Sequence, residues 1–489
     1  MTAPVREGRL VPGQALSRAS QRTLRDHNLS LVFADIARAT TPPSRADVAL
    51  ATGLTKATVS SLVKSLIEVG LVSELPLTTG SGAGRPATPL TLAGGRVAAI
   101  GLEINVDFTG LRVIDIAGNT LADLVEPTNL RGQSPLPVLT SLMRRAYDLV
   151  AQLVADGVTV VGAALALPGL TDHPRGPLRL APNLGWRDID LMSTLADALD
   201  AVVLSTGLVS PTVTSPDIGR PESGLPAAPA GPLTRWEPTA PASTDQPQTA
   251  SADSAYARRA TPADQPDPVM ALCRWLFVDH LLADNEANLA ARVETGRHPG
   301  TSFIYVSGEI GIGAAIVVDG QVFTGLHGWA GEIGHVVVDQ AGPRCGCGSL
   351  GCLETYAGKQ AMLRQAGLDE AAGVDGLLQA LSDGQPAARQ AIDRAATALG
   401  VALADCLNLV DVDQVVLGGD LAPLTEALRP GLEAQLADRV LASRWLGGRT
   451  QVRAASGEAY PALTGGALVG LDPILAEPGW LIDRAEATG

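Results

Sequence analysis

One histidine and three cysteines lie close together in the stretch from Gly325 to Glu354. Cys345, Cys347 and Cys352 follow His335 at spacings of ten, twelve and seventeen residues. Three thiolates and one imidazole make a complete tetrahedral set for a zinc ion, with no position left open for water. The cysteines could instead form disulfides or stay idle, but a Cys-x-Cys bridge is strained and one cysteine would be left over. The stretch therefore predicts a structural zinc site.

The same stretch carries a family resemblance. Gly328-x-Ala330-Gly331-Glu332-Ile333-Gly334-His335 is followed by Cys345-x-Cys347-Gly348-x-x-Gly351-Cys352-x-Glu354. Together these segments resemble the signature of the ROK family, which contains bacterial sugar kinases and sugar-responsive transcriptional repressors. The resemblance implies an α/β domain of two actin-like, ribonuclease-H-like lobes with a sugar bound between them.

The resemblance also implies which side chains contact the sugar. They are Asn285, Glu286, Glu332, His335 and Glu354, and Glu286 stands where the kinases have their catalytic aspartate. A sugar suits such a set because each hydroxyl donates one hydrogen bond and accepts others. His335 would hold zinc with one ring nitrogen and face a sugar hydroxyl with the other. The alternative for Glu332 and Glu354 is a pair of solvated surface carboxylates.

The elements that come before this site begin with the pattern of an all-α winged helix. Apolar residues repeat at helical spacing over residues 21–40, and two prolines follow. Ser44 caps a short helix, Arg45 to Thr52, and Thr55 starts a third helix that runs to about Val69. Strand-like residues 71–74 and 89–92 flank a glycine-rich tip and predict a wing.

The outward face of the third helix is small or basic, which suits the major groove of DNA. The residues expected to contact DNA are Arg45, Thr55, Lys56, Ala57, Thr58, Ser60, Ser61, Lys64 and, at the wing tip, Arg85. Residues 1–96 carry eleven Lys/Arg and six Asp/Glu, against 25 and 45 in the rest of the chain. Only this end is therefore expected to meet an anionic polymer. The segment also resembles the winged helix of ROK repressors, which ROK kinases lack. A three-helix module that does not bind DNA is the alternative.

Composition and pattern divide the 489 residues into several parts. We expect a flexible arm (1–20), the winged helix (21–95), a first lobe (96–200), an insertion (201–268), a second lobe (269–475) whose last helix returns to the first, and a tail (476–489). Twelve prolines between Pro211 and Met270 predict a disordered insertion. The sequence has no apolar run of about twenty residues and no signal-peptide core, so we expect a cytoplasmic protein without a membrane span.

Two loops depart from the ROK kinase pattern. Glu103-Ile104-Asn105-Val106-Asp107 stands in place of Asp-x-Gly-x-Thr, and Glu309-Ile310-Gly311-Ile312-Gly313 in place of Gly-Thr-Gly-x-Gly. Phosphoryl transfer needs donors and metal around the ATP phosphates, whereas Asp107 and Glu309 add negative charge there. These departures predict that ATP binding is lost while the sugar pocket remains.

The sequence therefore favours a sugar-responsive transcriptional regulator, most simply a repressor and not an enzyme. Its partners would be a palindromic double-stranded DNA operator and a sugar or sugar-phosphate effector, bound by a homodimer or homotetramer. One rival is a sugar kinase with a DNA-binding appendage. Another is a constitutive DNA-binding protein whose pocket is vestigial.

Overall fold

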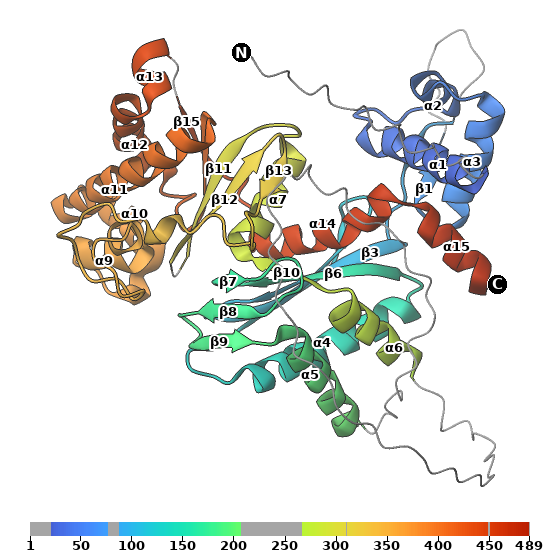
Figure 1. Ribbon diagram of the computed structural model, residues 1–489, viewed down its shortest axis with the longest axis horizontal. Helices are drawn as coiled ribbons and strands as arrows, with labels where there is room; N and C mark the ends of the chain where they lie inside the picture. Colours follow the sequence, from blue (N-terminus) through green and yellow to red (C-terminus); the bar gives the residue numbers. More distant parts are fainter. Residues whose placement is uncertain (1–20, 77–87, 207–266, 310, 448–449, 489) are drawn as a thin grey trace, which may run out of the picture.

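The computed structural model describes residues 21–76, 88–206, 267–309, 311–447 and 450–488. The expected arm, the wing tip with Arg85 and residues 207–266 of the expected insertion lie outside the described residues. A small N-terminal domain stands beside two larger lobes (Figure 1). No helix in the described ranges is long and apolar enough to cross a membrane.

The N-terminal domain is the predicted winged helix, and its helix ends follow from local signals. Ser44 and Asp47 form a reciprocal capping box at the start of the second helix, and Gly53 ends this helix with a left-handed φ of 71°. The two strands pair antiparallel, with Val72 opposite Leu92. The elements are α1 (Gln21–Arg38), α2 (Arg45–Thr52), α3 (Lys56–Glu68), β1 (Val72–Glu74) and β2 (Leu90–Leu92).

The first lobe is built on a five-stranded sheet in the order β10-β6-β3-β4-β5. The strand β3 pairs antiparallel with β4 and parallel with β6, as expected for a hairpin followed by a helical crossover. The lobe contains β3 (Val97–Ile104), β4 (Phe108–Asp115), β5 (Thr120–Pro127), α4 (Pro135–Ala155), β6 (Thr159–Leu167), β7 (Leu170–Thr171), β8 (Leu178–Ala181), β9 (Trp186–Ile189) and α5 (Leu191–Thr206).

The second lobe repeats this topology, with the order β13-β12-β11-β14-β15. In both sheets the first three strands form an antiparallel meander and the last two add in parallel on the other side. This duplication confirms the actin-like fold. The lobe contains β11 (Phe303–Gly308), β12 (Ile312–Val318), β13 (Gln321–Phe323), α8 (Glu354–Ala357), α9 (Lys359–Ala366), α10 (Gly373–Ser382), α11 (Pro386–Val410), β14 (Gln414–Gly419), α12 (Thr425–Arg439), α13 (Leu441–Leu446) and β15 (Gln451–Ala454).

The boundary expected between the lobes at residue 269 is wrong. Residues that follow the insertion belong to the first lobe: α6 (Pro268–Arg274) and a π-helical turn (Trp275–Asp279) join its core, and β10 (Leu282–Asn285) pairs parallel with β6. The expected insertion also begins too early, because α5 continues to Thr206. Residue spacing could not reveal that the chain returns to the first sheet, since strand pairing across an insertion is a long-range contact.

Two helices cross between the lobes with their backbones almost in contact. These are α7 (Glu286–Arg297), which packs on the second sheet, and α14 (Pro461–Ala476), which packs on the first. A Cβ at Gly465 of α14 would lie 1.7 Å from the carbonyl oxygen of Leu289, and one at Gly101 would lie 1.8 Å from that of Leu463. Glycine is therefore required at both positions. The final long helix returns to the first lobe, as expected.

The N-terminal domain shares its core with the end of the chain. Leu29, Val32 and Phe33 of α1 belong to the same buried cluster as Leu471 and Ile474 of α14. The last helix, α15 (Gly479–Thr488), extends this cluster and lies beside the winged helix (Figure 1).

Stacked tryptophans join this last helix to the segment that leads into the cleft. The ring of Trp480 stacks on that of Trp275 at 5.7 Å between centroids, and the guanidinium of Arg484 lies over both rings. Trp275 opens the π-helical turn that leads into β10. Helix α15 therefore contacts both the winged helix and the first lobe.

Candidate functional site

A cleft opens between the lobes where strands of both sheets end. The first lobe contributes loops after β3, β6 and β8 and the end of β10, and the second contributes the loop after β11 and the stretch that holds the histidine and cysteines. The five side chains expected to contact a sugar all line this cleft: Asn285, Glu286, Glu332, His335 and Glu354. Residues far apart in the chain thus converge on one pocket.

Asn285 and Glu286 are positioned by the turn from β10 into α7. The side chain of Asn285 caps the helix, because its Oδ1 accepts the Ala287 N–H at 2.8 Å. Its Nδ2 donates to the Gly169 carbonyl at 3.1 Å, which fixes the amide orientation. Burial, together with the nearby charge of Glu309, raises the pKa of Glu286 well above its usual range.

The two loops that differ from the kinase pattern meet across the cleft. Asn105 Nδ2 of the first lobe donates to Glu309 Oε2 of the second lobe at 2.6 Å. Both side chains line the pocket. Glu103, which is 1% exposed, lies nearby, and burial followed by repulsion from Glu309 and Glu286 raises its pKa. An amide of the first lobe and a carboxyl of the second are therefore joined directly across the cleft.

Asp107 does not act as expected. Its carboxylate accepts from Arg131 Nη1 at 2.6 Å, its side chain is 53% exposed, and it does not line the pocket. The repulsive charge predicted in the first loop is thus turned to the surface and neutralised. Of the two acidic residues predicted to oppose a phosphate, only Glu309 lines the pocket.

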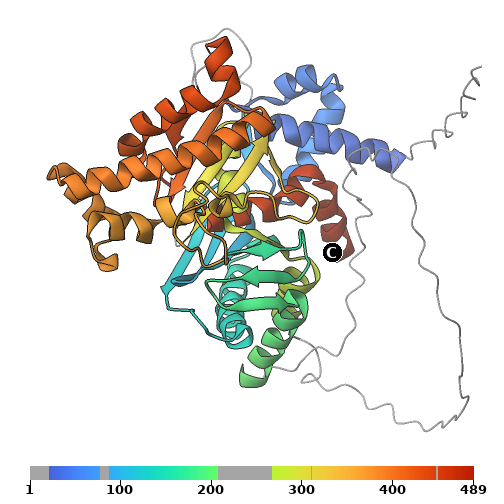
Figure 2. The same cartoon turned by 60° about the vertical axis from the view of Figure 1, so that its left-hand side comes forward.

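A second contact between the lobes lies at the edge of the small sheet β7-β8-β9, which faces the second lobe (Figure 2). The His173 N–H donates to the His327 carbonyl at 3.0 Å, and Trp329 Nε1 donates to Asp172 Oδ1 at 3.1 Å. The lobes are therefore joined on both sides of the pocket.

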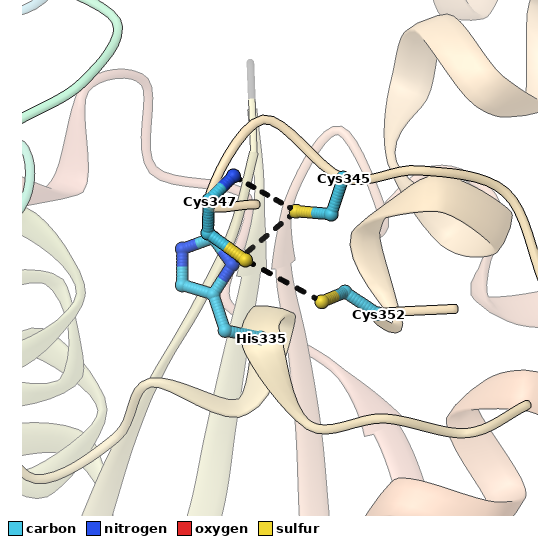
Figure 3. Close-up of side chains that lie close together, drawn as sticks. All are labelled: His335, Cys345, Cys347 and Cys352. Atoms are coloured by element: carbon cyan, nitrogen blue, oxygen red, sulfur yellow. Dashed lines mark hydrogen bonds between the residues drawn. The ribbon is translucent and has the colours of Figure 1, made fainter. Parts of the chain in front are cut away.

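The His335 imidazole and three cysteine thiols form a compact cluster (Figure 3). All four ligand atoms lie within 4.8 Å of one another. Cys347 Sγ is 3.6 Å from Cys352 Sγ, and Cys345 Sγ is 3.7 Å from His335 Nδ1. Ligands at zinc–sulfur distances of about 2.3 Å lie about 3.8 Å apart on a tetrahedron, so these groups could hold a metal ion.

The backbone of this loop is shaped for the cluster. Gly351 has a φ of 68°, and a Cβ there would lie 1.6 Å from the Asp339 carbonyl oxygen. The Cys345 N–H donates to the Ser349 carbonyl at 2.9 Å, which closes the turn. A hydrogen bond from the Ser349 backbone lowers the pKa of Cys347 to about 7, which favours the thiolate. All five cysteines of the chain are free thiols, so the disulfide alternative is wrong.

The outward face of α3 is exposed as expected at Lys56, Ala57, Ser60, Ser61 and Lys64. Its apolar face is buried through Val59, Leu62, Val63 and Leu66.

Four of the expected DNA contacts already have partners within the domain, one of them Lys64, whose Nζ lies 3.6 Å from Glu68 Oε1. Thr55 caps the helix and hydrogen-bonds Thr58 at 2.9 Å. Arg45 is paired with Glu74 of the wing strand β1. These residues help to build the winged helix, and a DNA contact from Arg45 would compete with its ion pair.

Four polar side chains of the pocket were not among the predicted site residues. Asn105 and Glu309 were recognised only as departures from a kinase pattern, and Asn183 lies in the loop after β8. Ser307 carried no sequence signal, because it is an ordinary residue within the strand β11.

Comparisons with known proteins agree with this geometry. The ROK family model matches residues 278–469, and the model of the IclR helix-turn-helix domain matches residues 28–76. The xylose repressor of Bacillus subtilis is 24% identical over 349 residues, which is 71% of this chain and 69% of that protein. The kanosamine kinase of Amycolatopsis mediterranei is 35% identical over 158 residues, 32% of this chain and 52% of that protein.

A solved structure shows the same fold over nearly the whole chain. It is a ROK family transcriptional regulator described as a homolog of the Escherichia coli MLC protein. It has a TM-score of 0.64 and 20% identity, and covers 94% of this chain and 99% of its own. The family matches show that this chain carries a ROK family domain over residues 278–469 and an IclR-type helix-turn-helix domain over residues 28–76.

Proposed function

We propose that this protein is a transcriptional repressor that binds operator DNA through its winged helix and responds to a sugar in the cleft. The observation that carries the proposal is the Asn105–Glu309 contact across a pocket that is also lined by all five side chains expected to contact a sugar. The similarity to a xylose repressor, which covers 71% of this chain and 69% of that protein, supports the same reading.

The cleft has the chemistry of a sugar site. Carboxylates, an amide and an imidazole converge from both lobes, so a bound sugar would hydrogen-bond to each lobe at once. Such a ligand favours one interlobe arrangement over another by its difference in affinity for the two. Because the winged helix shares its core with α14 of the first lobe, a change in lobe angle moves the DNA-binding helix.

We do not propose that the protein transfers a phosphoryl group. Glu309 and Asn105 stand where ROK kinases would bind phosphates, and Glu286 is one methylene longer than the aspartate of those enzymes. Oligomerisation as a dimer or tetramer on a palindromic operator is part of the proposal, as is a cytoplasmic location beside that DNA.

Zinc is the metal that best fits the cluster, and its proposed role is structural. Three thiolates and an imidazole fill a tetrahedron, so no water would be activated. His335, Cys345, Cys347 and Cys352 would hold it. The metal would lock the loop that carries His335 and Glu354 into the cleft wall. Cys345 Sγ also contacts Glu354 Oε1 at 2.8 Å, which connects the cluster to the sugar-facing carboxyl.

The test uses the full-length chain in two steps. DNA fragments bound by the protein are selected from genomic DNA, and fluorescence anisotropy then measures operator affinity at fixed salt across a panel of sugars. We expect one sugar to weaken binding. Glu332→Gln should reduce this response, whereas Glu426→Gln on the exposed side of α12, which is 80% exposed, should leave it unchanged. A DNA affinity that no sugar alters would contradict the proposal.

A sugar kinase remains the second candidate, because a kanosamine kinase is 35% identical over part of the chain. A coupled assay of ADP release across the same sugars tests it. Sugar-dependent turnover that disappears in Glu286→Gln would favour the kinase.

A further inference from the structure

The pocket has a strongly one-sided charge. Four carboxyl groups line it, from Glu286, Glu309, Glu332 and Glu354, and among the described residues no lysine or arginine lines it. His335 is the one basic side chain on the described walls, and it belongs to the metal cluster. Phosphate groups in proteins are instead bound by arginine, lysine or free backbone N–H groups.

Three carboxyl groups lie close enough to repel one another. Glu309 and Glu286 line the pocket, and the charge of each acts on the buried Glu103. Burial raises the pKa of each of these three carboxyls, and their mutual repulsion adds to the rise for Glu103 and Glu286. The same two forces would oppose a phosphate group, which carries more charge than a carboxylate.

The helix N-terminus and the lysine that could stabilise a phosphate near the pocket already have partners. Helix α7 points its N-terminus at the pocket, but Asn285 Oδ1 accepts the Ala287 N–H, and the Glu286 carboxyl stands in the first turn. Lys359 is a cation whose charge acts on Glu309, yet it does not line the pocket, and its Nζ is paired with Asp420 at 2.8 Å.

We infer that the pocket selects an unphosphorylated sugar and rejects the phosphate ester of the same sugar. The inference rests on the proposed function. It narrows the expected effector from a sugar or sugar phosphate to a sugar without a phosphate group. The discriminating group is Glu309, held across the cleft by Asn105. Like-charge contact at a buried site costs several kcal/mol, so rejection is expected to be roughly a hundredfold in affinity.

Matched pairs of ligands test this with the full-length, zinc-supplemented protein. Isothermal titration calorimetry would compare glucose with glucose 6-phosphate and N-acetylglucosamine with its 6-phosphate. We expect at least one neutral sugar to bind, with its phosphate ester roughly a hundredfold weaker. A phosphate ester that binds as tightly as its parent sugar, or more tightly, would overturn the inference.

A variant without the Glu309 charge tests whether this residue causes the difference in affinity between a sugar and its phosphate ester. Glu309→Gln keeps the side-chain size and an acceptor for Asn105, and should narrow the affinity ratio between parent sugar and ester by about tenfold or more. Glu426→Gln, whose side chain is 80% exposed on the second lobe, should leave the ratio unchanged. An unchanged ratio in Glu309→Gln would overturn the role of this residue. If no sugar binds and none alters DNA binding, the proposed function itself fails. If neutral sugars alter DNA binding but the phosphate esters bind equally well, only the present inference fails.

Discussion

Because the winged helix and α14 share one buried core, a cavity made in α14 should also destabilise the winged helix. Ile474 is 1% exposed and belongs to the buried cluster that contains Leu29, Val32 and Phe33 of α1. Ile474→Ala removes three buried carbons, which costs about 2–5 kcal/mol in a core that cannot collapse. A loss of about 3 kcal/mol corresponds to roughly a hundredfold faster amide exchange wherever exchange requires this cluster to open.

Hydrogen exchange followed by mass spectrometry measures this region by region. We expect Ile474→Ala to speed exchange in α1 and α3 as well as in α14 itself. The matched control is Ile392→Ala, because Ile392 is 3% exposed but belongs to the core of the second lobe on α11. This control should speed exchange in α11 and leave α1 unchanged. If α1 exchanges at the wild-type rate in Ile474→Ala, the winged helix is an independent unit and the reasoning is refuted.

Three further predictions concern the metal, the DNA face and a buried carboxyl. Cys347→Ser should lose bound metal, measured by mass spectrometry of the eluted ion, and unfold at a lower temperature, whereas Cys406→Ser outside the cluster should keep the metal. Lys56→Ala should reduce the slope of log affinity against log salt by about one, while Arg364→Ala on α9 should leave the slope unchanged. Burial raises the pKa of Glu103, so the stability it contributes is present below the pKa of the unfolded chain and is lost as the pH rises through the folded pKa. Glu103→Gln should therefore raise the unfolding temperature more at about pH 8 than at about pH 5.

Each of these three has an outcome that would count against it. A metal-free Cys347→Ser protein with the wild-type unfolding temperature would remove the structural role of the cluster. An unaltered salt slope in Lys56→Ala would mean that this lysine does not meet a phosphate. Equal stabilisation by Glu103→Gln at both pH values would show that Glu103 is not protonated preferentially in the folded state.

Local signals in the sequence located much of this structure. The caps at Ser44 and Thr55 and the turn at Gly53 act within a few residues, so they predict the helices of the winged domain. The His335, Cys345, Cys347 and Cys352 set is also nearly local, because a short loop contains all of it. Its geometry followed from the residue types and spacing alone.

Contacts between residues far apart in the chain could not be predicted from the sequence. Nothing in residues 268–285 indicates that they return to the first sheet, since their pairing partner β6 precedes the insertion. Asp107 was expected to face a phosphate, but it turns to Arg131, a residue 24 positions away with no motif of its own. The docking of the winged helix on α14 and α15 joins the two ends of the chain, and no periodicity reports such a contact.

The close crossing of α7 and α14 has a mechanical consequence. At Gly465 backbone meets backbone, while buried side chains from both lobes pack around the crossing in one cluster. Helix α14 is 16 residues long, roughly 24 Å, with the crossing near its start and the winged helix near its end. Because α14 connects the crossing to the winged helix, we expect any rotation of the second lobe about Gly465 to be transmitted along this helix to α3. A side chain added at Gly465 would collide with the Leu289 carbonyl oxygen and push α7 and α14 apart.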